Sequence, residues 1–286
     1  MTTARTMLTI ALLTLREASR RRVMLALGGL TIALLALSGW GFSRLAAESG
    51  GSALTSGEAR LTASIVLNLV MFGFSLIAAL GTAFLAGPTL SGETESGIAL
   101  AMLARPVRRS AFLLGKWLGL VTFGGGFVVL AGLAQILVVR ATADYWPPNP
   151  AGALALLAAE TAVLLTLAVL LSTAISPMAS GVVAVGLFCM TWVAGVVGGV
   201  GASFGNESVE RIGTVSRIVL PTDGLWQGAM HAFQDPSVFA TFGGADVEAF
   251  PFLSSAPLTV TYLAWAAAWV AMVWGLAAAS FVRKDL

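Results

Sequence analysis

Few side chains in this chain could carry catalysis, and those few stand apart from one another. His231 is the only histidine and Cys189 the only cysteine, so the sequence offers no cluster of metal ligands and no intramolecular disulfide. A phosphate-binding loop around Gly115-Lys116 would need Gly at position 110 and Ser or Thr at position 117, where Ser110 and Trp117 stand. We therefore expect no catalytic residue, no metal and no cofactor bound by this chain.

Three polar side chains, Asn68, Gln135 and Glu160, stand inside long apolar stretches. Glu160 lies about nine residues into its stretch, or about 13 Å at the rise of a helix, where an unpaired charge is costly. We expect all three to share the outer half of a helix bundle. They could line the exit of a path through the membrane, or they could lock helices together with Glu160 protonated or hydrogen-bonded. Interhelical polar contacts are common in membranes, which favours the second role.

The elements that position these side chains are apolar stretches long enough to cross a membrane. The chain is 57% hydrophobic and 10% charged, whereas soluble domains are about 25% charged. Roughly 20 apolar residues cross the hydrocarbon core as a helix, which satisfies the backbone in lipid. The predicted fold class is a single all-α integral membrane domain with six transmembrane helices. They are expected at residues 23–42, 61–87, 111–139, 151–175, 179–200 and 257–282.

The basic residues predict the orientation of these helices. With the N-terminus inside, eleven of the 16 Lys and Arg residues fall on the cytoplasmic side, as retention of positive charge requires. The chain is therefore expected to be a multi-pass protein of the cytoplasmic (inner) membrane with both termini cytoplasmic. Residues 1–22 have an apolar face and an Arg cluster, which predicts an interfacial elbow helix, either a topology anchor or a contact for a partner. No basic groove with interleaved aromatic residues supports a nucleic-acid partner.

The densest charged stretch is the cytoplasmic segment 89–110. Ser91 followed by Glu93 and Glu95 has the composition of a helix start, and Pro106 would end that helix. We expect the second span to end at Pro88 and a short, polar-capped cytoplasmic helix to follow it. Such a helix would be a handle for a partner protein.

The motifs of this segment resemble a known family. Gly92-Glu93-x-Glu95-x-Gly97, Arg105-Pro106-Val107-x-Arg109 and Leu114-Gly115-Lys116 resemble the intracellular loop of ABC exporter permeases whose ATPase is a separate chain, the ABC-2-type membrane subunits. Leu15-Arg16-Glu17-Ala18 and Leu220-Pro221-Thr222-Asp223-x-Leu225-Trp226 resemble more narrowly the NosY-like branch, named for multicopper-enzyme maturation. The likeness covers the whole chain in length and span order. Gly97 is followed by Ile98-Ala99-Leu100 rather than the commoner Thr, Leu and Glu, which puts one polar contact to the ATPase in doubt.

The resemblance implies the type V (ABCG-like) exporter fold, a six-helix half-transporter that pairs with itself or with a related permease. Two copies of an ABC ATPase subunit would dock below and hold the ATP and Mg²⁺, so the chain itself would not be an enzyme. Segment 89–110 would couple ATP-driven closure to alternating access and export. Glu93, Glu95 and Arg105 are the expected contacts to the ATPase, with solvated surface charge as the alternative.

In such permeases the central cavity lies between the second and fifth helices of two protomers. The resemblance therefore makes Phe72, Phe74, Phe188 and Trp192 candidates to line it, with core packing or lipid contact as the simpler role for each. An apolar lining would favour an amphipathic or lipid-like substrate over an ion. Copper or sulfur cargo would need soft ligands, but Met71, Cys189, Met190 and Met230 share no motif, and Met in apolar helices usually fills the core.

Two further features concern packing. Gly115 with Gly119, and Gly195 with Gly199, have the spacing that lets helices approach closely, either between protomers or, as we favour, within the chain. Segment 202–256 predicts an outer cap with helices at 207–219 and 222–233 separated by Pro221, the second capped by Thr222 or Asp223. The cap could be an exit gate or a simple lid.

Two other functions stay open. A membrane scaffold or assembly factor would dock the ATPase without moving cargo. A secondary transporter would need an inverted repeat with interrupted helices in matching positions, and the sequence offers no convincing one.

Overall fold

The structure, a computed structural model, describes residues 3–20, 22–48, 57–95, 109–236 and 250–283. These residues form helices and connecting segments, without strands. The helices are α1 (Thr3–Arg20), α2 (Arg22–Glu48), α3 (Gly57–Glu95), α5 (Arg109–Ala143), α6 (Pro150–Ser172), α7 (Pro177–Ser203), α8 (Glu207–Val219), α9 (Thr222–Phe233) and α12 (Val260–Arg283).

Six of these helices, α2, α3, α5, α6, α7 and α12, are long and apolar enough to cross a membrane. The sequence prediction of six spans in an all-helical membrane protein is thereby confirmed. The ends follow local sequence. Pro150 and Pro177 stand in the first turns of α6 and α7, where proline is favoured because the amide that it lacks would have no helical partner. The Asn149 side chain caps α6 by accepting from the Gly152 amide at 3.0 Å.

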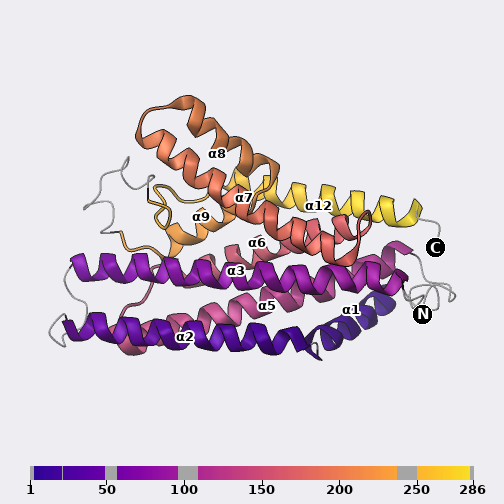
Figure 1. Cartoon of the computed structure of the whole chain (residues 1–286), viewed down its shortest axis with the longest axis horizontal. Helices are drawn as coiled ribbons and strands as arrows, with labels where there is room; N and C mark the ends of the chain where they lie inside the picture. The colour runs from indigo at the N-terminus through magenta and orange to yellow at the C-terminus, as the bar shows by residue number, and fades with distance from the viewer. Residues whose placement is uncertain (1–2, 21, 49–56, 96–108, 237–249, 284–286) are drawn as a thin grey trace.

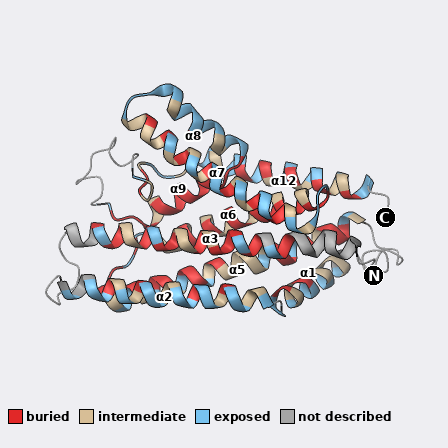
Figure 2. Ribbon diagram, viewed as in Figure 1, coloured by how far each residue is buried: buried red, intermediate tan, exposed pale blue. Residues whose placement is uncertain are grey.

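The centre of the bundle is built by α3 and α6. The apolar windows of these helices are 61% and 56% buried, against 17% for α2, which lies at one edge with long exposed stretches (Figure 2). The core around them, to which α5 and α9 also contribute, holds large buried side chains, among them Leu67, Phe74, Ile136 and Trp226. A helix that is apolar on every side yet mostly uncovered by protein is suited to lipid contact.

The two ends of the bundle differ. The first helix, α1, lies at the end where α3 finishes, α5 starts and α12 finishes, whereas the short helices α8 and α9 lie toward the other end (Figure 1). We call these the α1 end and the α8–α9 end. Because the number of spans is even, the first span, α2, starts at the same end of the bundle at which the last span, α12, finishes.

At the α1 end, α1 packs tightly on α5. A Cβ at Gly115 would lie 2.9 Å from the Met7 carbonyl oxygen, and one at Gly119 would lie 2.7 Å from the Ala11 carbonyl oxygen. Lys116, between these glycines, is buried and pairs with Glu17 at 3.5 Å. The glycine pair in α5 therefore serves packing within the chain.

The course of α3 differs from our expectation. We predicted that the span ends at Pro88 and that a separate helix starts near Ser91, but α3 continues unbroken through both residues to Glu95. The prediction of a break is wrong. An interior proline removes one helical hydrogen bond and its ring crowds the preceding turn, but its φ angle is that of a helix, and the chain continues as a helix through it. The helix therefore extends nine residues, about 13 Å, beyond its apolar window, which ends at Ala86.

Candidate functional site

The α8–α9 end carries a cavity whose frame is a close contact between α7 and α8. A Cβ at Gly198 would lie 2.7 Å from the Gly213 Cα, and one at Gly201 would lie 2.7 Å from the Glu210 amide nitrogen. Such contacts involve backbone and cannot be relieved by a side-chain rotation. These glycines let α8 lie directly on the last turns of α7.

Helices α8 and α9 occupy the ranges 207–219 and 222–233 that the sequence predicts. Their caps differ from our expectation. Asn206 caps α8 by accepting from the Val209 amide, while α9 starts after Pro221 without a side-chain capping bond. Thr222 instead lies 3.0 Å, Oγ1 to Oγ1, from Thr191 of α7, and Asp223 takes part in an ion pair.

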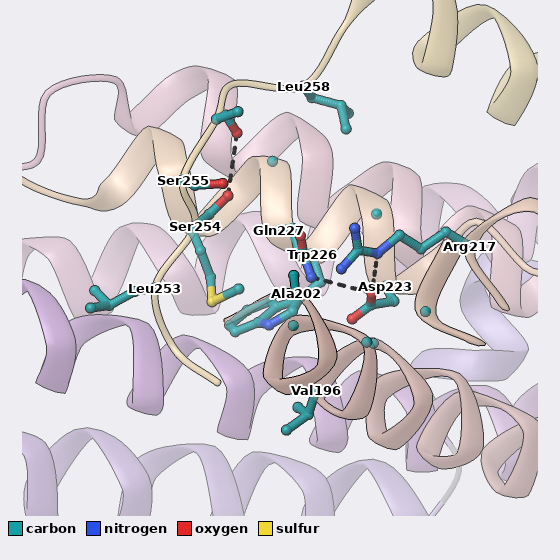
Figure 3. Close-up of a pocket in the computed structure, with 18 of the residues that line it drawn as sticks. Val196, Ala202, Arg217, Asp223, Trp226, Gln227, Leu253, Ser254, Ser255 and Leu258 are labelled. Atoms are coloured by element: carbon teal, nitrogen blue, oxygen red, sulfur yellow. Dashed lines mark hydrogen bonds and ion pairs between the residues drawn. The ribbon is translucent and has the colours of Figure 1, made fainter. Parts of the chain in front are cut away.

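That ion pair joins the two short helices. The Arg217 Nε donates to the Asp223 Oδ2 at 2.8 Å, across the bend at Pro221 (Figure 3). The Asp223 side chain is 2% exposed and the Arg217 side chain 30%. Gly195 of α7 lies against the carboxylate, where a Cβ would overlap its oxygens.

Burial sets the proton affinity of this carboxyl. Loss of water around Asp223 raises its pKa above the ordinary value of 3.8, and the charge and hydrogen bond of Arg217 oppose that rise without cancelling it. Asp223 therefore takes up a proton at a higher pH than an exposed aspartate.

The C-terminal end of α8 is held by α12. Tyr262 donates its hydroxyl hydrogen to the Arg217 carbonyl oxygen at 3.0 Å. Trp265 and Trp269 donate their indole hydrogens to the carbonyls of Ile218 and Val219 at 3.2 and 2.8 Å. The last carbonyls of a helix lack partners within it, so these bonds tie α8 to a membrane-crossing helix.

The opposite wall is the segment 250–259, which precedes α12. The side chain of Gln234 makes two hydrogen bonds to the backbone of Ser254. It accepts from the Ser254 backbone N–H at 3.0 Å and donates to the Ser254 carbonyl oxygen at 2.7 Å. His231 also lies 3.4 Å from that carbonyl. The segment is thereby fixed to the end of α9.

Between these walls lies a cavity of about 350 Å³, which we call the α7–α9 cavity. Its polar side chains come from α8, α9, the 250–259 segment and α12, and include Glu210, Arg217, Asp223, Gln227, Ser254 and Tyr262. Figure 3 shows Arg217 and Gln227 converging on Asp223. The described lining holds charged groups, amides and hydroxyls, which can bind a polar group through hydrogen bonds and charge.

The three buried polar residues named from the sequence lie in separate contacts. Asn68 of α3 donates to the Phe252 carbonyl at 2.9 Å, Gln135 of α5 donates to the hydroxyl of Ser38 in α2, and Glu160 of α6 accepts from the Ser75 hydroxyl of α3 at 3.0 Å. All three side chains are buried. No described hydrogen bond joins any two of the three, and each links two different elements.

The four aromatic residues named from the sequence separate into two pairs. Phe72 stacks on Trp192 with ring centroids 4.6 Å apart, and Trp192 lines the α7–α9 cavity. Phe74 and Phe188 are almost completely enclosed by the chain's own helices, so they pack the interior of the bundle. Phe252 of the cavity wall lies 5.8 Å from Phe72 and 6.2 Å from Trp192, between ring centroids.

Two of the three predicted coupling residues lie at the α1 end. Glu93 and Glu95 are in the last turn of α3, and Arg105 lies outside the described residues. Arg109, the first residue of α5, donates to the Val282 carbonyl near the end of α12 at 3.1 Å.

Sequence reasoning did not anticipate the contacts that Arg217, Tyr262 and Gln234 make. A signal was present for Arg217 and Asp223, since two opposite charges flank Pro221 in a segment that is otherwise apolar. No sequence pattern pairs Tyr262 with a carbonyl 45 residues before it.

A family model described as ABC-2 family transporter protein matches residues 8–286. No curated protein matches the chain.

Proposed function

Because the chain belongs to the ABC-2 family of transporter proteins, we propose that it is the permease subunit of an ATP-driven exporter whose ATPase is a separate chain. The permease component of this family is not itself catalytic. The proposal adds that a pair of ATPase subunits docks at the α1 end, that this end is cytoplasmic, and that two permeases, identical or related, form the complete transporter in the cytoplasmic membrane.

The observation that carries this proposal is the course of α3. At one end it reaches Glu95, next to segment 96–108. At the other end Ser64 and Asn68, one turn apart, bond the Asp235 amide and the Phe252 carbonyl, at 3.1 and 2.9 Å. Asn68 and Glu95 are 27 residues apart, or about 40 Å along one helix. A push near Glu95 would reach the wall of the α7–α9 cavity directly.

Alternating access follows from this connection. Closure of the ATPase pair on ATP would move the 96–108 segment and, with it, α3 and the start of α5. Because α1 is packed on α5 through Gly115 and Gly119, these helices would move together. The shift at Asn68 would then displace the 250–259 segment, which opens or closes the cavity.

Two of the alternatives raised by the sequence can be weighed. A polar cavity at the end of the bundle favours transport over a scaffold role, since a scaffold needs no cavity. Family membership favours ATP-driven transport over a secondary transporter. The narrower NosY-like assignment rests on residues 15–18 and 220–226 alone and stays a prediction.

The test is a pull-down of the tagged full chain in mild detergent from cells that express its whole operon, with an ATPase assay of the eluate. We expect an ATPase subunit to co-purify, and we expect Glu93→Ala with Glu95→Ala to weaken its retention. Glu207→Ala with Glu210→Ala removes two acids at the other end and should leave retention unchanged. A wild-type chain that purifies without an ATPase would contradict the proposal.

A further inference from the structure

A second cavity adjoins the α7–α9 cavity and differs from it in chemistry. It measures about 680 Å³ and lies between α6, α9 and α12. Its lining is mostly apolar and includes Gly152, Ala155, Leu156, Ala159, Ala232 and Leu263. We call it the α6–α12 groove.

The two cavities share a thin wall. Gly228, Pro257 and Leu258 line both of them. Gly228 presents no side chain, and a Cβ there would lie 2.9 Å from the Leu258 Cβ and 3.2 Å from Leu156 Cδ1. A polar chamber and an apolar groove are therefore separated at Gly228 by one layer of side chains, those of Leu156 and of the half-buried Leu258.

The groove lies where lipid reaches the protein. Both α6 and α12 are membrane-crossing helices by length and composition, and the groove starts beside their first turns. Ala159 is nine residues into α6, about 13 Å from its start, so the groove continues through most of the roughly 15 Å of hydrocarbon in one leaflet. Apolar surface at this depth fits a hydrocarbon tail.

The charges of the α7–α9 cavity specify the head group. Arg217 donates to Asp223 through Nε, and no hydrogen bond from its Nη atoms is found within the described residues. Its Nη donors are therefore available to an anionic oxygen such as that of a phosphate. Glu210 lines the same cavity two turns earlier on the same face of α8, about 10 Å along the helix. With Asp223 included, the charged lining has two acids and one base, so a purely anionic head group is disfavoured and one that also carries an ammonium is favoured.

We propose that the α7–α9 cavity and the α6–α12 groove together form one binding site for an amphiphile with a zwitterionic phosphate and ammonium head group. The head group occupies the polar cavity, its phosphate on Arg217 and its ammonium toward Glu210, and one acyl chain enters the groove where displacement of the 250–259 segment moves Leu258 aside from Gly228. This inference rests on the proposed function, in which the site would hold the exporter's substrate as it enters the leaflet at the α8–α9 end.

Photo-cross-linking of the purified full chain in phosphatidylglycerol nanodiscs tests the site. The probe is phosphatidylethanolamine with a diazirine in one acyl chain, compared with phosphatidylglycerol that carries the same chain. We expect the ethanolamine probe to label peptides of 148–159 and 228–236 preferentially. Arg217→Gln with Asp223→Asn removes both charges and keeps hydrogen-bonding groups, and it should lower labelling by about tenfold, the loss expected for a hydrogen bond to a charged group.

Matched variants separate this site from lipid that merely surrounds the protein. Arg211→Gln removes an exposed arginine of the same helix that lies outside the α7–α9 cavity, and labelling should stay unchanged. Ala155→Trp fills the groove from an exposed position of α6, whereas Ala151→Trp places the same ring outside it. Only the first should abolish labelling of 148–159, and thermal melting checks that each variant is folded.

Three results would overturn the inference: equal labelling by both probes, labelling that the charge-removing variant leaves unchanged, or competition by glycerophosphoethanolamine as strong as that by the intact lipid. The last would mean that the cavity binds a soluble zwitterion without the groove. Because labelling needs no ATPase, its loss leaves the pull-down intact, and failure of the pull-down leaves the labelling intact.

Discussion

Arg217 and Asp223 form an ion pair of 2.8 Å between the last turn of α8 and the first turn of α9, with the acid buried and the base partly open to the cavity. The pair holds the bend at Pro221 and supplies the charge of the proposed site. The two partners differ in their contact with solvent, because only the acid is buried away from water.

The inequality predicts an asymmetric response to mutation. Arg217→Gln strands a buried carboxylate and should destabilise the fold on the order of 3 kcal/mol, whereas Asp223→Asn leaves a partly solvated arginine and should cost about 1 kcal/mol. Thermal melting of the purified variants in detergent measures both. Equal losses would show that the pair is solvated and carries little structural weight.

The raised pKa of Asp223 predicts a pH dependence of stability. A carboxyl whose pKa is higher in the folded state binds its proton more tightly there, so its contribution to stability is complete below the ordinary value of 3.8 and is lost as pH rises through the raised pKa. In melting curves between about pH 4 and about pH 7, the melting temperature of wild type relative to that of Asp223→Asn should rise as pH falls. A constant difference across that range would rule out the raised pKa.

Gly198→Ala should separate α7 from α8. The added Cβ would meet the Gly213 Cα at 2.7 Å, and overpacking against backbone costs about 1–3 kcal/mol. Gly186→Ala in the same helix, where a Cβ meets nothing within 4 Å, is the control and should be neutral or slightly stabilising. If the two variants melt alike, the close contact between α7 and α8 is absent in the folded protein.

Gly119→Ala should loosen α1 at the other end. Its Cβ would lie 2.7 Å from both the Ala11 carbonyl oxygen and the Thr14 Cβ, so α1 must shift. Gly126→Ala, in open space on the same helix, serves as the control. Hydrogen exchange of residues 3–20 should rise in the first variant alone, and unchanged exchange there would argue against tight packing of α1 on α5.

Asn68→Leu should uncouple the cavity from the ATPase. The change removes the bond to the Phe252 carbonyl and leaves that part-buried oxygen without this partner, a loss of about 1 kcal/mol. We expect the ATPase subunit to be retained while ATP-driven transport falls. Leu69→Ala, a neighbouring exposed position, should change neither. Loss of retention and transport together in Asn68→Leu would mean that α3 serves assembly rather than transmission.

Much of the architecture follows from the chain itself. Bilayer thickness sets a minimum apolar length, so composition and spacing were enough for six spans. Pro221 and the helical spacing on either side of it were enough for α8 and α9. The prediction failed at Pro88. The local rule that proline ends a helix did not hold there, in a helix that packs against α6 and α7.

What only the tertiary structure decided is which buried polar groups meet. Helical periodicity gives the face on which a side chain lies, but it does not give the rotation of that helix against its neighbours or the identity of the facing residue. Asn68 donates to the Phe252 carbonyl, 184 residues later in the chain, and Tyr262 donates to the Arg217 carbonyl, 45 residues earlier. A buried polar atom must be paired by whatever the packed helices bring within about 3 Å of it, and that is a property of the whole bundle.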